Sequence, residues 1–254
     1  MANPFYQRGV ERANRVRVLF ATIARRYDLI NDLQSLGLHR HWKQRLVRLA
    51  RVGPEQQALD VCCGTGDVAF ALADTGASVT GLDFSPEMLA VAEARRLRRL
   101  VRPALVPPGE VVTARARPGS VHFVEGDALQ LPFPDAAFDA VTIAYGLRNL
   151  ADLEAGIVEL CRVLRPGGRL VALDFGKPAN RAWRTLYFGY LRMAVPVFGW
   201  LFAGSAGAYS YILESLRHYP GQEEVAALLR RQGLSKVTMV NLLCGAMALH
   251  AAER

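Results

Sequence analysis

The chain has 254 residues, 51% of them hydrophobic, so it can bury one large core with a small helical cap. Its formal net charge of +8 would suit binding to an anionic lipid surface or to nucleic acid, and the alternative is that the charges lie on solvated helix faces. Because no RNA-binding motif accompanies the charge, no nucleic-acid partner is expected. The four cysteines are Cys62, Cys63, Cys161 and Cys244, and they form no CxxC pair and no metal-ligand spacing. We therefore expect no metal site, and we expect the cysteines to be reduced thiols of a cytosolic protein.

The N-terminal region is predicted to begin with a helix. Its start has no long apolar run, so no secretory signal peptide is expected. Residues 11–26 alternate Arg with apolar residues at helical spacing, which predicts a basic amphipathic helix. Residues 27–42 are rich in Asp, Asn, Ser and Gly, which favour turns, yet they contain Tyr, His and Trp, which a plain linker rarely needs. Helix is predicted again over 39–51.

A glycine-rich turn follows the first predicted strand. The apolar run 58–61 contains Asp60, and Gly64-Thr65-Gly66 then leads into an apolar helical pattern. Glycine takes positive φ readily and lets a ligand approach the backbone, while free N–H groups at a helix start face that ligand. The turn therefore predicts a small-molecule site.

The ligand of this turn is predicted to be S-adenosylmethionine (SAM). The turn fits the dinucleotide pattern only loosely, as Gly64-x-Gly66-x-x-Ala69, so NAD or FAD is an alternative, as is a turn without a ligand. Asp60 stands where a carboxylate can meet a positively charged ligand group. Residues 164–168, Leu-Arg-Pro-Gly-Gly, resemble the turn before strand five of class I methyltransferases.

Strands and helices alternate after this turn, as is typical of a parallel sheet. Between them, residues 101–120 are expected to be a surface insertion without chemistry of its own. Strands are predicted over 58–61, 78–82, 121–125, 140–144, 169–174, 236–241 and 246–250, and helices over 66–74, 86–100, 151–164 and 223–232.

Residues 180–217 are predicted to be helical and are rich in aromatic side chains. A membrane-spanning helix needs about twenty apolar residues, and the longest uncharged run here, 193–205, is shorter. The segment would line an apolar substrate pocket, lie in the membrane interface, or pack in the core of a cap.

Further carboxylates suit the other parts of SAM. Asp83, at the end of strand two, can accept both ribose hydroxyls; the alternative is an N-cap of the next helix, which Ser85 before Pro86 provides better. After strand three, Asp127 offers an acceptor for the adenine amine. The predicted cofactor-binding residues are Asp60, Gly64, Thr65, Gly66, Asp83, Asp127 and Ala128.

Along essentially its whole length the chain resembles the ubiquinone/menaquinone biosynthesis C-methyltransferases. The first family signature is present, with Ile30 in place of the usual Met, as Tyr27, Asp28, Asn31, Ser35, His39 and Trp42. The second signature begins with a match at residues 162–168, but further along it has Asp174 and Gly176 where Glu and Ser are usual. Three shorter segments also resemble the family: 146–150, 214–217 and 248–250.

This resemblance implies an α/β fold: a Rossmann-like class I SAM-dependent methyltransferase with a mostly parallel seven-stranded sheet and a helical cap. We expect a single domain over 1–254. Its parts would be an N-terminal helical cap segment (1–52), a SAM-binding core (53–176), substrate-cap helices (177–220) and a C-terminal helix with a strand pair (221–254).

The implied reaction is transfer of the SAM methyl group to a ring carbon of a polyprenylated quinol. Demethylmenaquinol is the favoured substrate, and a ubiquinone-pathway benzoquinol is the alternative. Other classes remain open: a flavin or nicotinamide oxidoreductase, and a non-catalytic prenyl-lipid binding module. Since a prenyl quinol lies in the bilayer, we expect a cytoplasmic protein peripheral on the inner face of the membrane, attracted to anionic lipid; homo-oligomer formation is left open.

An aromatic carbon is a poor nucleophile until an adjacent phenol ionises, near pH 10 when unperturbed. The resemblance points to Arg148 and Asn149, with Tyr27 nearby. Arginine is too basic to accept a proton, so we expect Arg148 to lower the phenol pKa, and water or His39 to take the proton. The alternatives are that Arg148 pairs with Asp152, that Asn149 caps the next helix, and that His39 only ties down its loop.

Overall fold

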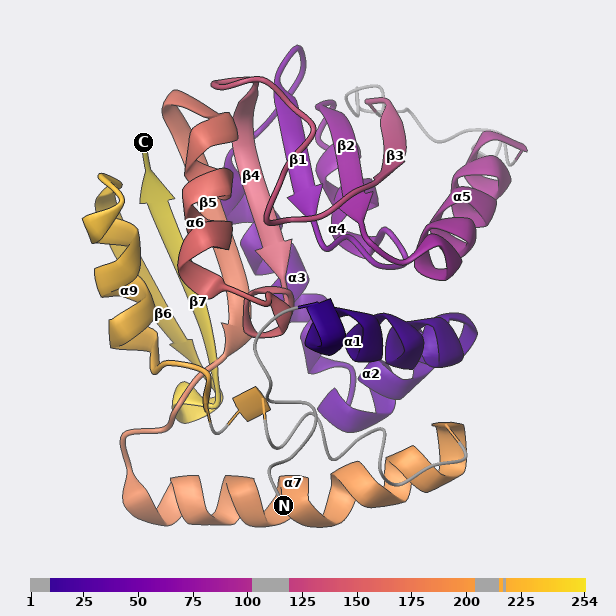
Figure 1. The fold of residues 1–254 in the computed structure, drawn as a ribbon, viewed down its shortest axis with the longest axis vertical. Coiled ribbons are helices and arrows are strands. Elements are labelled where there is room, and N and C mark those ends of the chain that lie inside the picture. The colour runs from indigo at the N-terminus through magenta and orange to yellow at the C-terminus, as the bar shows by residue number, and fades with distance from the viewer. Residues whose placement is uncertain (1–9, 102–118, 204–214, 217) are drawn as a thin grey trace, which may run out of the picture.

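The computed structural model describes residues 10–101, 119–203, 215–216 and 218–254. Within these ranges one seven-stranded sheet has the order β3-β2-β1-β4-β5-β7-β6 (Figure 1). β7 alone runs opposite to the other strands, so it pairs antiparallel with both β5 and β6. This confirms the predicted mostly parallel sheet. The strands are β1 (Gln57–Val61), β2 (Ser78–Asp83), β3 (Val121–Glu125), β4 (Phe138–Ala144), β5 (Leu164–Phe175), β6 (Ser235–Leu242) and β7 (Met247–Glu253).

The strand order reverses between β1 and β4. From β1 the chain proceeds outward to β2 and β3, then returns to pair β4 against the other side of β1, with Asp60 opposite Thr142. In open parallel sheets, ligands bind beyond the carboxyl ends of the strands at such a switch point. The glycine-rich turn follows β1 at this place.

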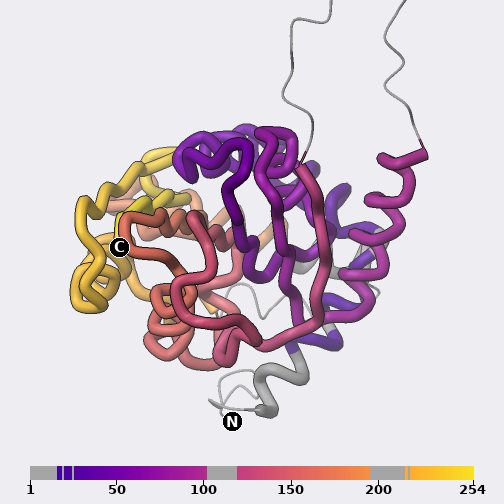
Figure 2. Tube along the Cα trace, turned by 90° about the horizontal axis from the view of Figure 1, so that it is seen from above, coloured from indigo at the N-terminus to yellow at the C-terminus, as the bar shows by residue number. Residues whose placement is uncertain are grey.

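Helices cover both faces of the twisted sheet (Figures 1 and 2). On one face, α3 (Leu38–Ala50) and α4 (Asp67–Ala73) bury Leu46 and Leu72 against β1, β4 and β5. On the other, α6 (Leu153–Val163) and α9 (Gln222–Arg231) bury Ile157 and Val225. The fifth helix, α5 (Pro86–Val101), packs against β2, β3 and the N-terminal helices.

The N-terminal helices and α7 form a cap beyond the carboxyl ends of the parallel strands (Figure 1). These elements are α1 (Val10–Ile23), η2 (Ala24–Arg26), α2 (Tyr27–Ser35) and α7 (Arg181–Ala203). The helices predicted over 11–26 and 180–217 are confirmed for the described residues. Most of the predicted insertion, residues 102–118, lies outside the described residues, as do residues 204–214 and 217.

The turn-rich interpretation of residues 27–42 is wrong. Residues 27–35 form the helix α2, and the turn shrinks to Leu36 and Gly37, both with positive φ. Ile30 is 2% exposed and packs in one cluster with Ile23 and Tyr187. Burial of this apolar face outweighs the small helix propensity of Asp and Asn, because propensity is worth only about 0.7 kcal/mol per residue.

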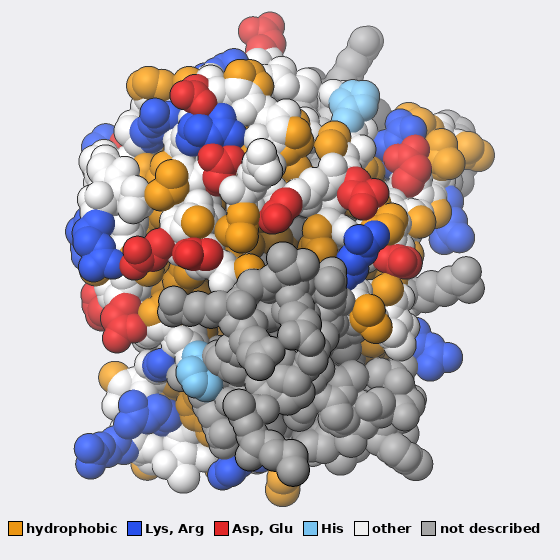
Figure 3. Space-filling model, viewed as in Figure 1, with side chains coloured by type: hydrophobic (Ala, Val, Ile, Leu, Met, Phe, Trp, Pro, Cys, Tyr) orange, Lys and Arg blue, Asp and Glu red, His pale blue; other side chains and the backbone are white. Residues whose placement is uncertain are grey.

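The positive charge of the sequence is partly neutralised in the fold. Along α5, Arg95 pairs with Asp67, Arg96 with Glu93, and Arg99 with Asp74. On the face drawn in Figure 3, acidic and basic side chains lie interspersed. Within the described residues, none of the helices is both long enough and apolar enough to cross a membrane.

Candidate functional site

The glycine-rich turn joins β1 to α4, with Gly64 at φ +55° and Gly66 at φ +85°. A side chain is excluded or tolerated for different reasons at the two positions. A Cβ on Gly64 would find only the Tyr27 ring, at 3.9 Å, so this side of the turn is open. At Gly66 the same space is filled by the rings of Phe70 and Phe123, each 2.9 Å from the added atom. Gly64 therefore leaves room for a ligand, whereas Gly66 leaves room for the two phenylalanine rings of the core.

Asp83 lies beside this turn, as predicted. Its Oδ2 accepts a hydrogen bond from Gly64 N at 2.8 Å, and its Oδ1 accepts one from Ser85 N at 3.0 Å. Burial raises the pKa of the Asp83 carboxyl, and the two backbone hydrogen bonds partly offset that rise. The Ser85 hydroxyl accepts a hydrogen bond from Met88 N at 3.4 Å, so Ser85 rather than Asp83 caps α5. Both oxygens of Asp83 keep a lone pair for a ligand.

Asp60 is 1% exposed at the carboxyl end of β1. Thr142 donates a hydrogen bond to its Oδ1 at 2.8 Å, while its Oδ2 has no hydrogen-bond partner among the described residues. Burial raises the pKa of Asp60 to about 7, although Thr142 and the charge of Lys43 oppose the rise. A buried carboxylate oxygen without a partner is costly. A positively charged ligand at the turn would supply the missing compensation.

The other predicted cofactor residues have protein partners. Asp127 lies after β3 and accepts a hydrogen bond from Leu129 N at 2.9 Å, and Ala128 is buried in the core beneath it. The Thr65 hydroxyl donates to Asp28 Oδ1 at 2.9 Å. Of the predicted residues, Gly64 and Asp83 line the small cavity at the turn. The others do not: Asp60, Thr65, Gly66, Asp127 and Ala128.

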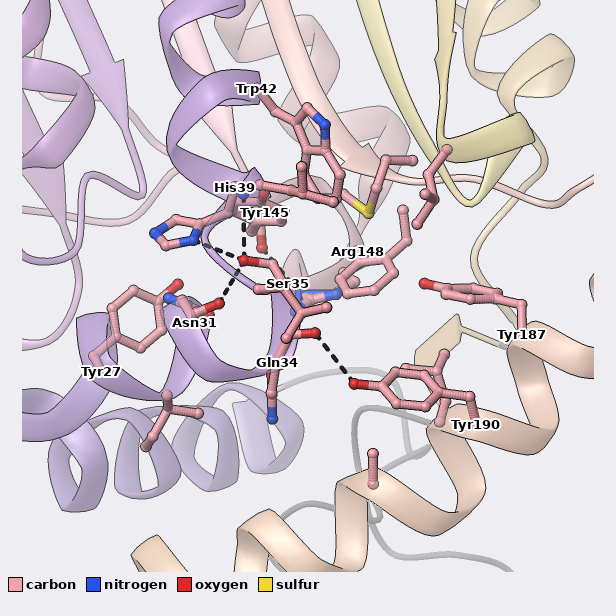
Figure 4. A pocket seen from close by; sticks show the side chains of 18 of the residues that line it. Tyr27, Asn31, Gln34, Ser35, His39, Trp42, Tyr145, Arg148, Tyr187 and Tyr190 are labelled. Atoms are coloured by element: carbon pink, nitrogen blue, oxygen red, sulfur yellow. Dashed lines mark hydrogen bonds between the residues drawn. The ribbon is translucent and has the colours of Figure 1, made fainter.

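Two cavities of very different size meet at this end of the sheet. The smaller, about 40 Å³, lies between the glycine-rich turn and the cap. The larger, about 580 Å³, lies between the N-terminal helices and α7, and its lining is mostly apolar (Figure 4). Three residues line both cavities: Phe20, Tyr27 and Tyr145. The predicted glycine-turn site and the predicted apolar pocket are therefore neighbours.

Arg148 projects into the larger cavity from a short 3₁₀ turn after β4 (Figure 4). Its Nη1 donates to Tyr145 O at 3.0 Å and to Asn149 Oδ1 at 3.1 Å, and its Nε lies 3.7 Å from Asp174 Oδ1. Asp174 is 3% exposed; burial raises the pKa of its carboxyl, and Arg148 opposes that rise.

The alternatives that paired Arg148 with Asp152 and made Asn149 a helix cap are wrong. Asp152 itself caps α6, because its Oδ1 accepts a hydrogen bond from Ala155 N at 3.1 Å. The Asn149 side chain instead donates from Nδ2 to Tyr145 O at 3.0 Å and lines the smaller cavity. Both members of the Arg-Asn pair therefore lie at the site.

His39 lines the larger cavity from α3 and is 2% exposed. Its Nδ1 lies 2.9 Å from Ser35 Oγ, and Nε2 has no hydrogen-bond partner among the described residues. Burial lowers the pKa of His39 to about 4, with Lys43 adding to the fall and Asp32 opposing it. His39 is therefore neutral near pH 7. Tyr27 lies at the cavity junction, and burial raises the pKa of its phenol.

A charged cluster that sequence reasoning missed connects the cap to the glycine-rich turn. Lys43 Nζ lies 3.0 Å from Asp67 Oδ2, and Arg95 contacts Asp67 Oδ1 at 2.8 Å and Asp28 Oδ2 at 2.9 Å. Asp28 also accepts the Thr65 hydrogen bond. The cluster joins α2, α3 and α5 to the start of α4. Its members are far apart in sequence, so only the family signature at Asp28 pointed to it.

Comparisons with known proteins agree with this geometry. Residues 8–254 match the model of the ubiE/COQ5 methyltransferase family. A demethylmenaquinone methyltransferase of Thermus thermophilus is 42% identical over 93% of this chain and 100% of its own length. A ubiquinone/menaquinone biosynthesis C-methyltransferase of Rhizobium leguminosarum is 37% identical over 96% of this chain and 90% of its own length.

Solved structures support the fold alone, since their identity is low. A SAM-dependent methyltransferase from Aquifex aeolicus superposes with a TM-score of 0.54 at 16% identity, over 83% of this chain and 88% of its own. The strand order, the two neighbouring cavities and the match over nearly the whole sequence lead to one assignment. The chain belongs to the ubiE/COQ5 methyltransferase family.

Proposed function

We propose that this methyltransferase uses SAM to methylate a ring carbon of a polyprenyl quinol, and that demethylmenaquinol is its substrate. The observation that carries the proposal is the pair of cavities that meet at Tyr27 and Tyr145. One adjoins a glycine-rich turn with buried carboxylates, and the other is large and apolar. The names of the two relatives described above favour a quinone-pathway acceptor, and the first of them favours menaquinone.

The residues around the smaller cavity fit SAM. The open side of Gly64 would accept close approach of the cofactor, and the Asp83 carboxylate would hold the ribose hydroxyls. Asp60 is buried and does not line the cavity, and it would compensate positive charge from behind the wall. When bound, SAM supplies an electrophilic methyl group on a sulfonium centre. A volume of about 40 Å³ is too small for a nucleoside. Binding therefore requires side chains of the cavity wall to move, and Phe20 of α1 and Tyr27 of α2 are two that could do so.

The larger cavity fits a quinol head group with part of its prenyl chain. Its wall includes Phe175 and the α7 aromatic residues Trp183 and Tyr187, which stack at 6.5 Å between ring centroids. Leu36 and Leu186 line the cavity and are 87% and 64% exposed, so the apolar wall continues to the surface. A prenyl chain can leave the cavity along this apolar edge without being transferred to water.

Polar groups inside the apolar wall suit the two oxygens of a quinol. Arg148 places positive charge in the cavity, where it lowers the pKa of an acceptor phenol. Asp174, 3.7 Å away, accompanies that charge, so the net field is smaller than that of a lone guanidinium. His39 is neutral with Nε2 available, so it can accept a phenol proton, although a pKa of about 4 makes it a weak base. Water is the other acceptor.

The test is a methyl-transfer assay with labelled SAM and chemically reduced acceptors. We expect a mass gain of one methyl group on demethylmenaquinol, little transfer to a demethylated benzoquinol, and none to oxidised quinone, because quinone carbonyls withdraw electron density from the ring. The rate should rise with pH until the phenolate form dominates. Full activity on oxidised quinone would overturn the mechanism. Lipid binding with unconsumed SAM would instead identify a non-catalytic prenyl-lipid binding module.

A further inference from the structure

A buried hydroxyl without a partner lies where the two cavities meet. Of the residues that line both, Phe20 has no polar side-chain atom, and the Tyr27 hydroxyl is not among the buried polar atoms that lack a hydrogen-bond partner. The Tyr145 hydroxyl is buried and has no hydrogen-bond partner among the described residues. Such groups are rare in folded proteins and need an explanation. A bound acceptor with its own oxygens would provide one.

Other polar atoms in the cavity wall are placed differently. Asn31, Gln34 and His39 each have a buried nitrogen without a partner among the described residues, but these residues line only the larger cavity. Tyr145 alone combines an unpartnered polar atom with a position on both described cavity walls. The carbon that receives the methyl group must lie at this same junction. An oxygen on the neighbouring ring carbon then lies close to Tyr145.

Tyr145 is held in a strained backbone conformation. Its φ of +60° is in the left-handed region, which costs a non-glycine residue roughly 1–3 kcal/mol and persists only where the surroundings enforce it. Its N–H donates to Leu173 O at 2.7 Å. Its ring packs edge-on against Phe175, with 6.2 Å between centroids. Strain of this kind is concentrated at functional sites.

The Arg-Asn pair enforces this conformation. The Tyr145 carbonyl accepts from Arg148 Nη1 and from Asn149 Nδ2, each at 3.0 Å. The next residue, Gly146, cannot carry a side chain, because a Cβ would lie 2.8 Å from the Cβ of Cys62. The backbone at Tyr145 is therefore fixed by the two side chains that follow it and by the strand end before it.

We propose that Tyr145 contacts the acceptor by donating a hydrogen bond from its hydroxyl to the acceptor oxygen next to the methylated carbon, and that Asn149 is a positioning residue that acts through Tyr145. The proposal rests on the proposed function and adds a residue to it. Burial raises the pKa of the Tyr145 phenol well above its ordinary value. The hydroxyl therefore stays protonated and acts as a donor, not as a base.

Tyr145→Phe removes only this hydroxyl and keeps the ring. A hydrogen bond to a charged oxygen is worth roughly 1.5–3 kcal/mol, so kcat should fall about 10- to 100-fold, while SAM affinity stays within about twofold. Because the hydroxyl stabilises the phenolate, its loss should also move the rising limb of the kcat–pH profile about one unit higher for each tenfold loss. A merely structural residue would not move that limb.

Tyr219→Phe is the matched control. The Tyr219 hydroxyl is also buried without a partner among the described residues, but Tyr219 lines neither cavity, so its variant should keep the wild-type kcat. A double-mutant cycle tests the positioning step. Asn149→Ala should lower kcat in the wild type and have little effect in the Tyr145→Phe background, since both changes remove one contribution.

The outcomes separate the two proposals. Absence of quinol methylation by the wild type overturns the proposed function, and the role of Tyr145 with it. Wild-type turnover with an unchanged kcat and pH profile in Tyr145→Phe overturns only the contact with the acceptor. Additive losses in the cycle overturn the positioning role of Asn149.

Discussion

We expect Asp60 to couple SAM binding to the release of a proton, if it compensates the charge of the cofactor as proposed. With a pKa of about 7 in the free protein, this carboxyl is about half protonated at pH 7. The cationic groups of bound SAM would favour the ionised form of Asp60, so binding would release the proton. We expect release of most of one proton per SAM at pH 6, and little release at pH 8. Affinity should fall about tenfold for each pH unit below 7.

The measurement is titration calorimetry in buffers of different ionisation enthalpy, compared with Asp60→Asn. The α-amino group of SAM titrates near pH 8 and contributes its own proton exchange. Subtracting the variant removes that contribution. Affinity for SAM at pH 8 should be about 10- to 100-fold lower in the variant, because a hydrogen bond to a charged group is lost.

The stability of the ligand-free protein should change in the opposite sense. The raised pKa of Asp60 means that its favourable contribution is present below the unfolded pKa, near 4, and is lost as the pH rises through about 7. Asp60→Asn avoids that loss, so its melting temperature should exceed that of the wild type at pH 8. Equal proton release by wild type and variant between pH 6 and 7 would refute the reasoning.

Three further predictions concern the cofactor, the acceptor and the membrane. Asp83→Ala should weaken SAM binding at least tenfold by calorimetry, with the fold retained by circular dichroism. Arg148→Ala should lower kcat by roughly 10²-fold with little change in SAM affinity, and Arg148→Lys should recover part of the rate because it keeps the charge. Neutralising the arginines of residues 11–26 should reduce binding to anionic vesicles, most clearly at low salt.

Each of these has a contrary outcome. Unchanged SAM affinity in Asp83→Ala would remove Asp83 from the site. A wild-type rate in Arg148→Ala would transfer its role to His39 and Tyr27. Equal partitioning of the wild type to neutral and anionic vesicles would contradict the electrostatic part of membrane attachment.

Much of the sheet and of the cofactor turn could be predicted from local pattern. The positions of Asp60 and Asp83 near the carboxyl ends of β1 and β2 follow from apolar runs that contain or meet a carboxylate, and the turn at Gly64 follows from its glycines. Because carboxyl ends of parallel strands meet at one edge of the sheet, residues distant in sequence come together there. Local pattern failed at α2, where burial of Ile30 selects helix in a stretch of turn-forming residues.

The sequence by itself determined the fold class, the glycine-rich turn and the identity of the residues that follow each strand, since these depend on short-range periodicity and backbone freedom. Only the tertiary structure decided their environment. It placed Arg148 against Asp174 rather than Asp152, and it buried His39 enough to lower its pKa to about 4. It also brought the Tyr145 hydroxyl to the junction of two cavities. Burial, charge pairing and cavity walls arise from contacts between distant segments, and no local pattern encodes them.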